Sequence, residues 1–278
     1  MRGFPAIHTG APMRDAIDLM VWPCFSLAKR PRHRPLDHRR AGDLLRVSTP
    51  AAGPGLATLW DADLLIWAVS QLAEGRDRGL EPVPLLCAPA FQVLRFLGHG
   101  TGRAQYAALA QALDRLAASE VETTLGTTTA EGHRFHWIER WTTDGDGLII
   151  LLPEWLWTAA VIRRRVLRID RAYLRLTGGV ERWLWRLLRR HAGLSTGWTI
   201  ALADLQARSG SLARPVDFMA DLRRIARRGV LAGYALTLVR HHGREALHAA
   251  RSTEPVHSAI VVPGDKPGVS STDGEGGL

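Results

Sequence analysis

Apolar and polar residues follow one another with helical or alternating spacing, and one order of predicted elements occurs twice along the chain. In the first half the spacing predicts a strand at 43–49, a long helix at 57–79, a short helix at 88–98, a second long helix at 103–118 and a β-hairpin at 121–141. In the second half it predicts a strand at 148–153, a short helix at 154–162, a strand at 165–170 and a helix at 179–193. A strand that runs into a short helix follows at 197–211, then another helix at 213–229 and a β-hairpin at 234–252. A helix, a short helix, a longer helix and a hairpin in each half is the order of a winged-helix domain. The sequence therefore predicts an α+β, mainly helical fold of tandem winged-helix domains with β-hairpin wings.

The two ends of the chain differ in composition from the middle. Residues 29–40, "KRPRHRPLDHRR", are basic and interrupted by proline, which is typical of a solvated arm or of an arm that binds phosphates. Residues 253–278 are rich in Gly, Ser, Pro and Asp, which predicts a disordered tail. We therefore expect a flexible leader and basic arm over 1–40, winged-helix domains over 41–145 and 146–252, and the tail.

The charge of the chain favours a polyanionic partner. The 278 residues carry a net charge of +9, and the pI is about 10.7. Lys29 and Lys266 are the only lysines, so arginine supplies nearly all of the positive charge, as in proteins from GC-rich bacterial genomes. The positions of the arginines therefore carry more information than their number.

A glycine-rich turn before the helix 103–118 could be read as a phosphate-binding loop. Gly98, Gly100 and Gly102 run into this helix, but an arginine and an alanine follow where a Walker loop needs Lys and then Ser or Thr. A dinucleotide fold requires a strand before the glycines, whereas the preceding residues have helical spacing. We therefore expect close helix approach at this turn, no cofactor and no enzymatic activity.

Metal-binding and membrane patterns are also missing from the sequence. Cys24 and Cys87 do not form a CxxC motif, and His133 and His136 fall on opposite faces of a predicted strand. No signal peptide is visible, and no apolar run reaches the length that spans a membrane. The expected protein has no metal site, does not contact membranes and is cytoplasmic.

The helix 103–118 has an apolar stripe and a polar face. The stripe, at i, i+3, i+7 and i+10, consists of Tyr106, Leu109, Leu113 and Leu116. The polar residues that could reach base edges and phosphates are Arg103, Gln105, Gln111 and Arg115. Glutamine and arginine are also common on ordinary helix surfaces, so this helix alone does not establish DNA binding.

The helix 214–228 gives a stronger indication, because its arginines form rows that repel one another. Its apolar stripe is Phe218, Leu222 and Ile225, and its candidate DNA contacts are Arg214, Arg223, Arg224, Arg227 and Arg228. A polyanion would relieve the repulsion; the alternative is that Asp221 neutralises Arg224 within the helix. Further candidate contacts to phosphates or the minor groove are His241, His242 and Arg244 in the hairpin, and Lys29, Arg30 and Arg32 in the arm.

With the basic arm, the glycine-rich turn and the predicted helices in this order, the chain resembles the replication initiator protein A family of plasmids in alpha- and other proteobacteria. The resemblance covers residues 20 to 250, and its matching stretches are "FSLAKRP" (25–31), "ATLWDADLLIWAVSQL" (57–72), "FLGHGTGRAQYAALAQALDRL" (96–116), "HRFHWIERW" (133–141), "IDRAYLRLTGGVERWLWRLLRRHAG" (169–193) and "SGSLARPVDFMADLRRIARR" (209–228). The family equivalent of "FSLAKRP" usually carries more lysine than this chain does.

The resemblance implies an initiator, present as a monomer or homodimer, that binds repeats in double-stranded DNA at a plasmid origin. It would open the adjacent DNA and help to load the host replicative helicase, together with the host initiator. Each winged-helix domain would place one helix in a major groove, at sites about one helical turn apart. The alternatives are a winged-helix transcriptional regulator, such as an autorepressor, and a protein whose winged helices contact other proteins.

Overall fold

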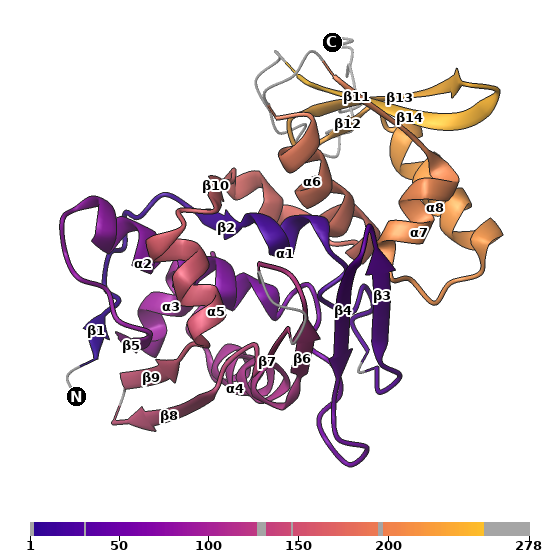
Figure 1. Ribbon diagram of the computed structural model, residues 1–278. Coiled ribbons are helices and arrows are strands. Elements are labelled where there is room, and N and C mark those ends of the chain that lie inside the picture. The colour runs from indigo at the N-terminus through magenta and orange to yellow at the C-terminus, as the bar shows by residue number, and fades with distance from the viewer. Residues whose placement is uncertain (1–2, 31, 127–131, 146, 194–196, 253–278) are drawn as a thin grey trace, which may run out of the picture.

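The computed structural model describes residues 3–30, 32–126, 132–145, 147–193 and 197–252 (Figure 1). Helices account for 38% of these residues and strands for 28%. The α+β class is thus confirmed, but the fold is not mainly helical, because strands from distant parts of the chain form three four-stranded sheets and one two-stranded ribbon within the described residues. The predicted tail at 253–278 lies outside them.

Two stretches, here called the N-terminal unit (residues 62–151) and the C-terminal unit (residues 179–251), share an order of elements. The N-terminal unit contains α2 (Ala62–Asp77), β5 (Leu85–Pro89), α3 (Ala90–Phe96), α4 (Arg103–Ala118), β8 (Arg140–Asp144) and β9 (Gly147–Leu151). The C-terminal unit contains α6 (Gly179–His191), β11 (Trp198–Ala201), α7 (Leu202–Ser209), α8 (Pro215–Arg227), β12 (Val230–Leu231), β13 (Tyr234–His241) and β14 (Arg244–Arg251). In each unit the strand after the first helix pairs antiparallel with the last strand of the closing hairpin, β5 with β9 and β11 with β14.

A further sheet is inserted into the N-terminal unit. β6 (Glu120–Thr123) and β7 (His133–His136) follow α4 and pair with β3 (Leu36–Arg40) and β4 (Asp43–Ser48), in the order β3-β4-β6-β7. The predicted strand at 43–49 is therefore present as β4, and it pairs with β6 on one side and, on the other, with β3, which lies in the predicted arm.

The hairpin that closes the N-terminal unit differs from the one predicted at 121–141. β6 and β7 fall in that range, yet the strands that join β5 are β8 and β9. The predicted domain boundary between residues 145 and 146 would separate β8 from β9, and the strand predicted to open the second domain belongs to the first sheet. The strands β6, β7, β8 and β9 all alternate between apolar and polar residues, and this alternation does not specify which strands pair.

The predicted flexible leader is wrong for the described residues of the N-terminus. β1 (Phe4–Pro5) pairs parallel with β5, β2 (Arg14–Ala16) pairs antiparallel with β10 (Val166–Arg168), and α1 (Ile17–Val21) packs against α6. Residues 3–26 contribute buried side chains, among them Phe4, Met13, Leu19 and Met20. Prolines and glycines between these positions hide the apolar periodicity in the sequence.

The segment between the two units consists of short elements. It contains α5 (Glu154–Trp157), a π-helical turn η1 (Thr158–Ile162), β10, and a 3₁₀ turn η2 (Arg171–Arg175). The short helix and the strand predicted at 154–162 and 165–170 are thus found close to their expected places. Through β10, this segment ties the N-terminal strand β2 to the start of the C-terminal unit.

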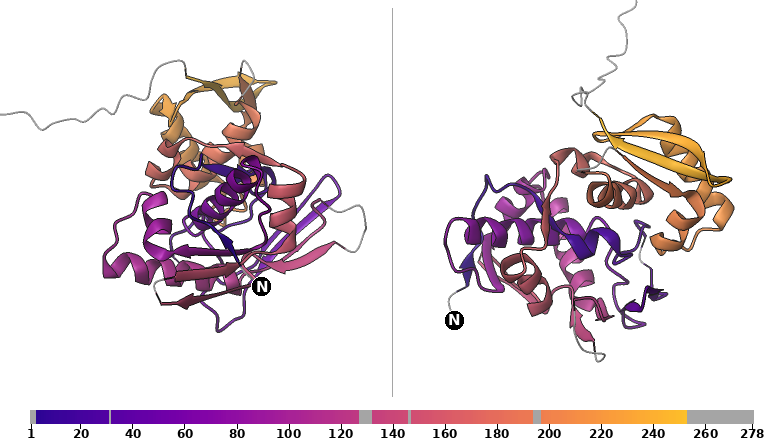
Figure 2. Two further views of the ribbon diagram at one scale, coloured as in Figure 1. Left: turned by 90° about the vertical axis from the view of Figure 1, so that its left-hand side faces the viewer. Right: turned by 45° about the horizontal axis from the view of Figure 1, so that its top comes forward.

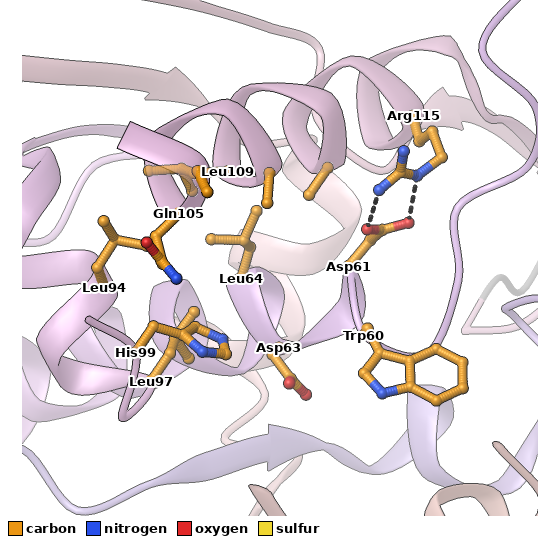
Figure 3. A pocket seen from close by; sticks show the side chains of 13 residues that line it. Trp60, Asp61, Asp63, Leu64, Leu94, Leu97, His99, Gln105, Leu109 and Arg115 are labelled. Carbon is orange, nitrogen blue, oxygen red and sulfur yellow. Dashed lines mark hydrogen bonds and ion pairs between the residues drawn. The ribbon is translucent and has the colours of Figure 1, made fainter. Parts of the chain in front are cut away.

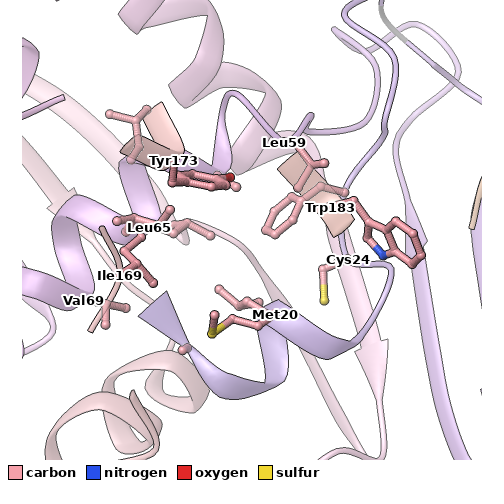
Figure 4. Close-up of a cluster of buried hydrophobic side chains, with 14 of the residues drawn as sticks. Met20, Cys24, Leu59, Leu65, Val69, Ile169, Tyr173 and Trp183 are labelled. Atoms are coloured by element: carbon pink, nitrogen blue, oxygen red, sulfur yellow. The ribbon is translucent and has the colours of Figure 1, made fainter. Parts of the chain in front are cut away.

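One hydrophobic core continues through both units. Buried side chains of α1, α2, η2 and α6 meet around Met20, Leu65, Tyr173 and Trp183 (Figure 4). In Figures 1 and 2 the two units lie against each other, with the β8–β9 and β13–β14 hairpins at opposite ends of the molecule. The shared core fixes the position of one unit relative to the other.

Two buried ion pairs reinforce this junction. Arg182 of α6 lies 2.8 Å from the carboxylate of Asp63 in α2, and Arg186 of α6 lies 2.7 Å from Asp15 in β2. Burial raises the pKa of Asp63 to about 6, although the charge and hydrogen bonds of Arg182 act in the opposite direction. A charge buried without its partner is costly, so these pairs oppose any rotation between the units.

Candidate nucleic-acid interface

The N-terminal half of α4 projects from the N-terminal unit. Arg103, Gln105 and Gln111 are exposed, as predicted, while Leu109, Leu113 and Leu116 are buried and anchor the helix. Tyr106, which the periodicity assigned to the core stripe, is 38% exposed because the first two turns of α4 extend beyond the body of the unit. The helix thus offers a mixed polar and aromatic end to a partner.

Arg115 does not lie on this outward face. Its guanidinium donates two hydrogen bonds, of 2.8 and 2.7 Å, to the carboxylate of Asp61, which is 3% exposed. Asp61 also accepts hydrogen bonds from the amide and hydroxyl of Thr58. The Arg115 side chain is therefore turned toward α2 and away from the outward face that the sequence predicts for it.

A cavity of about 350 Å³ separates the exposed end of α4 from α2 and α3 (Figure 3). Leu64, Leu94, Leu97 and Leu109 supply apolar parts of its lining, and the Arg115–Asp61 ion pair lies at one end. Gly98, with φ of +76°, allows the chain to turn sharply between α3 and α4. The positive φ expected at this turn is thus present at Gly98, but a Cβ at Gly98 or Gly100 would meet no atom within 4 Å, so the predicted close helix approach is wrong for these two glycines.

The apolar stripe of α8 is buried as predicted, and most of its arginines have carboxylate partners. The pairs are Arg214 with Asp217, Arg224 with Asp221, Arg223 with Glu245 of β14, and Arg228 with Glu181 of α6. The alternative in which Asp221 neutralises Arg224 is thus observed, at 2.7 Å. Arg227 is exposed and forms no ion pair with any described residue.

The hairpin that follows α8 ends in an exposed basic turn. His241 and His242 lie with their ring centres 4.1 Å apart, and Gly243 adopts a φ of +73°. Arg244 is exposed and lies 2.9 Å from Asp204 of α7. Glu245 and Asp204 were not singled out from the sequence, because their pairing depends on strands and helices that meet only in the fold.

The basic arm is structured where it is described, and it links the two units. The Lys29 ammonium lies 5.2 Å from the ring centre of Trp60, just before α2 of the N-terminal unit. Arg32 donates 3.0 Å to the carbonyl of Gly210, in the turn between α7 and α8, and also to two carbonyls of the arm itself. Arg30 is exposed. The expected flexible arm is therefore wrong for these residues, and Arg32 has a structural role.

The structure thus places the predicted residues in three groups. The outward end of α4 is one group, α8 with the β13–β14 turn is another, and the arm between Trp60 and Gly210 is the third. Within the described residues, no three His, Cys, Asp or Glu side chains gather as a metal site would require, and no helix has both the length and the apolar character to cross a membrane.

Comparisons with known proteins agree on one family and one fold. A family model described as Replication initiator protein A matches residues 14–236. A curated protein of Wigglesworthia glossinidia brevipalpis, named "Putative replication protein", is 25% identical over 233 residues, which cover 80% of this chain and 83% of that protein. A solved structure of selenomethionine derivatives of domains 2 and 3 of RctB matches with a TM-score of 0.62 at 12% identity, covering 83% of this chain and 95% of that one. A second structure of RctB domains 2–3 matches with a TM-score of 0.53 at 12% identity, covering 84% and 95%.

Proposed function

Because the chain belongs to the replication initiator protein A family, we propose that it starts plasmid replication by binding repeated sites in double-stranded origin DNA. The observation that carries this proposal is the shared order of the two units, in each of which an outward helix, α4 or α8, is followed by a hairpin. We interpret both units as winged-helix domains, with α4 and α8 as the helices that enter the major groove.

The junction between the units supports reading of two sites at a fixed distance. A fixed separation of α4 and α8 is supported by the shared core, by the pair Asp63–Arg182 between the units, and by the pair Asp15–Arg186 between β2 and α6. We therefore expect the two helices to contact sites about one helical turn apart, as other paired recognition helices do. Contacts from the α8 side and the arm to phosphates would make the affinity fall steeply with salt.

In this proposal the chain is a DNA-binding protein and not an enzyme. It acts in the cytoplasm, as a monomer or homodimer, without a cofactor. Bound at the repeats, it opens the adjacent duplex and recruits the host helicase with the host initiator. A role as a transcriptional autorepressor is compatible with the same DNA-binding surface.

The proposal is tested by footprinting on the origin DNA beside the gene and by supplying the gene in trans to a plasmid that carries this origin. Arg103→Ala should remove protection from one half-site and Arg227→Ala from the other, each weakening binding by about tenfold, equivalent to about 1.4 kcal/mol. Arg78→Ala, which removes an exposed arginine paired with Glu74 at the end of α2, is the matched control.

A change in the DNA tests the rigid spacing directly. Insertion of about five base pairs between the half-sites rotates one by half a helical turn and should abolish simultaneous protection. Protection that survives both the insertion and the two arginine variants contradicts the assignment of α4 and α8. Specific binding without replication in trans identifies a regulator instead of an initiator.

A further inference from the structure

A basic cavity lies at the junction between the units, outside the helices and hairpins that form the proposed DNA-reading surface. We call it the junction cavity; its volume is about 550 Å³. It is bounded by α1, the turn between β3 and β4, the last turn of α6, and the segment between η1 and β10. Its charged and titratable lining residues are Asp18, Arg40, Asp43, Arg163, Arg165, Arg190 and His191.

Two of the four arginines in the junction cavity have partners inside the protein, and two do not. Arg165 is paired with Asp18 at 2.8 Å, and Arg163 donates 2.7 Å to the carbonyl of Gly126. Arg40 and Arg190 form no ion pair with any residue in the described ranges. The cavity therefore presents two guanidinium groups without a direct ion pair, although Asp43 in the same lining acts favourably on the charge of Arg40.

Arg40 is held in place even though it has no anionic partner. Its guanidinium carbon lies 4.7 Å from the ring centre of Trp22, and its Nη1 atom is buried without a hydrogen-bond partner among the described residues. A buried N–H group without a partner is unfavourable, and an anion that enters the cavity would satisfy it. Because the side chain is already ordered on Trp22, little further conformational entropy would be lost on binding.

The neighbouring histidine is partly buried and lies close to several arginines. Burial lowers the pKa of His191 to about 4, and the charges of Arg208, Arg190 and Arg40 act in the same direction. The pKa of Arg40 is lowered as well, by burial and then by Arg208 of α7. Three arginines from β3, α6 and α7 thus act on one imidazole, which stacks on Trp198 with ring centres 4.6 Å apart.

We infer that the junction cavity binds a phosphate group, with Arg40 and Arg190 as its two ligands. A guanidinium presents a planar fork of donors that matches two phosphate oxygens, and it stays charged at neutral pH. The phosphate comes either from the DNA backbone, a reading that rests on the proposed function, or from a free polyphosphate. If the phosphate belongs to DNA, the protein binds the duplex backbone at the junction cavity, in addition to its contacts through α4 and α8.

His191 offers a direct probe in the full-length wild-type protein. A bound phosphate lowers the positive potential around the imidazole, so inorganic pyrophosphate should raise the pKa of His191 by about one pH unit. An NMR titration of the imidazole, assigned by its loss in His191→Gln, measures this pKa with pyrophosphate, with duplex DNA and with neither.

Paired variants test the two arginines. Arg40→Gln/Arg190→Gln should abolish the response of His191 to pyrophosphate. On duplex DNA it should also reduce the slope of log affinity against log salt concentration by about 1–2, since each phosphate contact contributes about 0.9. Arg78→Gln/Arg134→Gln removes the same charge at exposed positions outside the junction cavity and should leave both quantities unchanged.

The outcomes separate this inference from the proposed function. A His191 response to pyrophosphate with equal salt slopes supports the phosphate site and assigns it to a free ligand, even if the protein binds no origin DNA. An unchanged pKa of His191 with both ligands, together with equal salt slopes for the cavity and control variants, overturns the inference. The wild-type titration decides the matter even if loss of the Arg40–Trp22 contact unfolds the double variant.

Discussion

The N-terminal and C-terminal units repeat one order of elements but differ in charge where each would meet DNA. The turn of β8–β9 carries Thr143 and Asp144, whereas the turn of β13–β14 carries His241, His242 and Arg244. Both hairpins occupy the same place in their sheets. The same architecture therefore supports a phosphate contact at one hairpin and disfavours it at the other.

The two outward helices show a second difference. α4 has few charges on its exposed end, while α8 has several arginines, most of which are paired with Asp217, Asp221, Glu245 or Glu181. The free positive charge of α8 is thus much smaller than its composition suggests, and Arg227 supplies part of it. The comparison teaches that carboxylates on neighbouring elements, not the helix itself, determine how many arginines are available to a polyanion.

The largest expected effect concerns the junction that fixes the two units to each other. Arg182→Met leaves the carboxylate of Asp63 buried without its partner and should lower the free energy of unfolding by about 3–5 kcal/mol. Chemical denaturation measures this change. Arg182→Met/Asp63→Leu replaces the pair by apolar groups and should recover part of the loss, because the carbonyls of Leu174 and Leu176 still lose their donor. If the single variant loses less than about 1 kcal/mol, the pair does not hold the units together in the way described.

The next effect separates two arginines of the same helix. Arg115→Ala leaves Asp61 buried with only Thr58 and should cost about 2–3 kcal/mol of unfolding free energy. The affinity of the folded variant for DNA should not change. Arg103→Ala is the matched change on the outward face, and it should weaken DNA binding without a change in stability. Equal losses of affinity for the two variants would contradict the division of α4 into an outward and an inward side.

Sequence periodicity predicts much of this fold because the buried stripes obey it. Leu109 and Leu113 of α4 and Phe218 and Leu222 of α8 are buried at the spacing that the sequence shows. The same reasoning cannot locate contacts between distant residues. Arg115 and Asp61 are 54 positions apart, and nothing in the local pattern of α4 distinguishes Arg115 from Arg103.

Strand pairing and the N-terminus lie outside what periodicity predicts for a related reason. The strands of both hairpins, β6–β7 and β8–β9, alternate in polarity, but only the β8–β9 hairpin pairs with β5, through β9. Phe4 is buried because it fits against Gly75 of α2, where an added Cβ would come within 2.3 Å of the ring. Such complementarity depends on two segments that the sequence places far apart.

A smaller effect tests the difference in charge between the hairpin turns. Arg240 is exposed near the end of β13, next to this turn. Arg240→Ala, together with His242→Ala, should weaken DNA binding by about three- to tenfold, because in the proposed complex it removes phosphate contacts next to the β13–β14 turn. Asp144→Ala at the β8–β9 turn should change the affinity by less than about twofold. Fluorescence anisotropy at a fixed salt concentration compares the variants. A loss at Asp144 as large as that at the basic turn would show that the two hairpins act alike.

The smallest expected effect is a pH dependence at the end of α6, where the C-terminal unit differs from the N-terminal one. At the end of α2, Asp77 is paired with Arg14 and Arg76, whereas His191 at the end of α6 lies among arginines. Its pKa falls from 6.5 to about 4 in the fold, so protonation favours the unfolded chain. The stability that neutral His191 contributes is present above pH 6.5 and is lost as the pH falls through about 4. Unfolding free energies measured between these limits should therefore decline more for the wild type than for His191→Gln, and parallel curves would mean that burial and the neighbouring arginines do not lower the pKa of this imidazole.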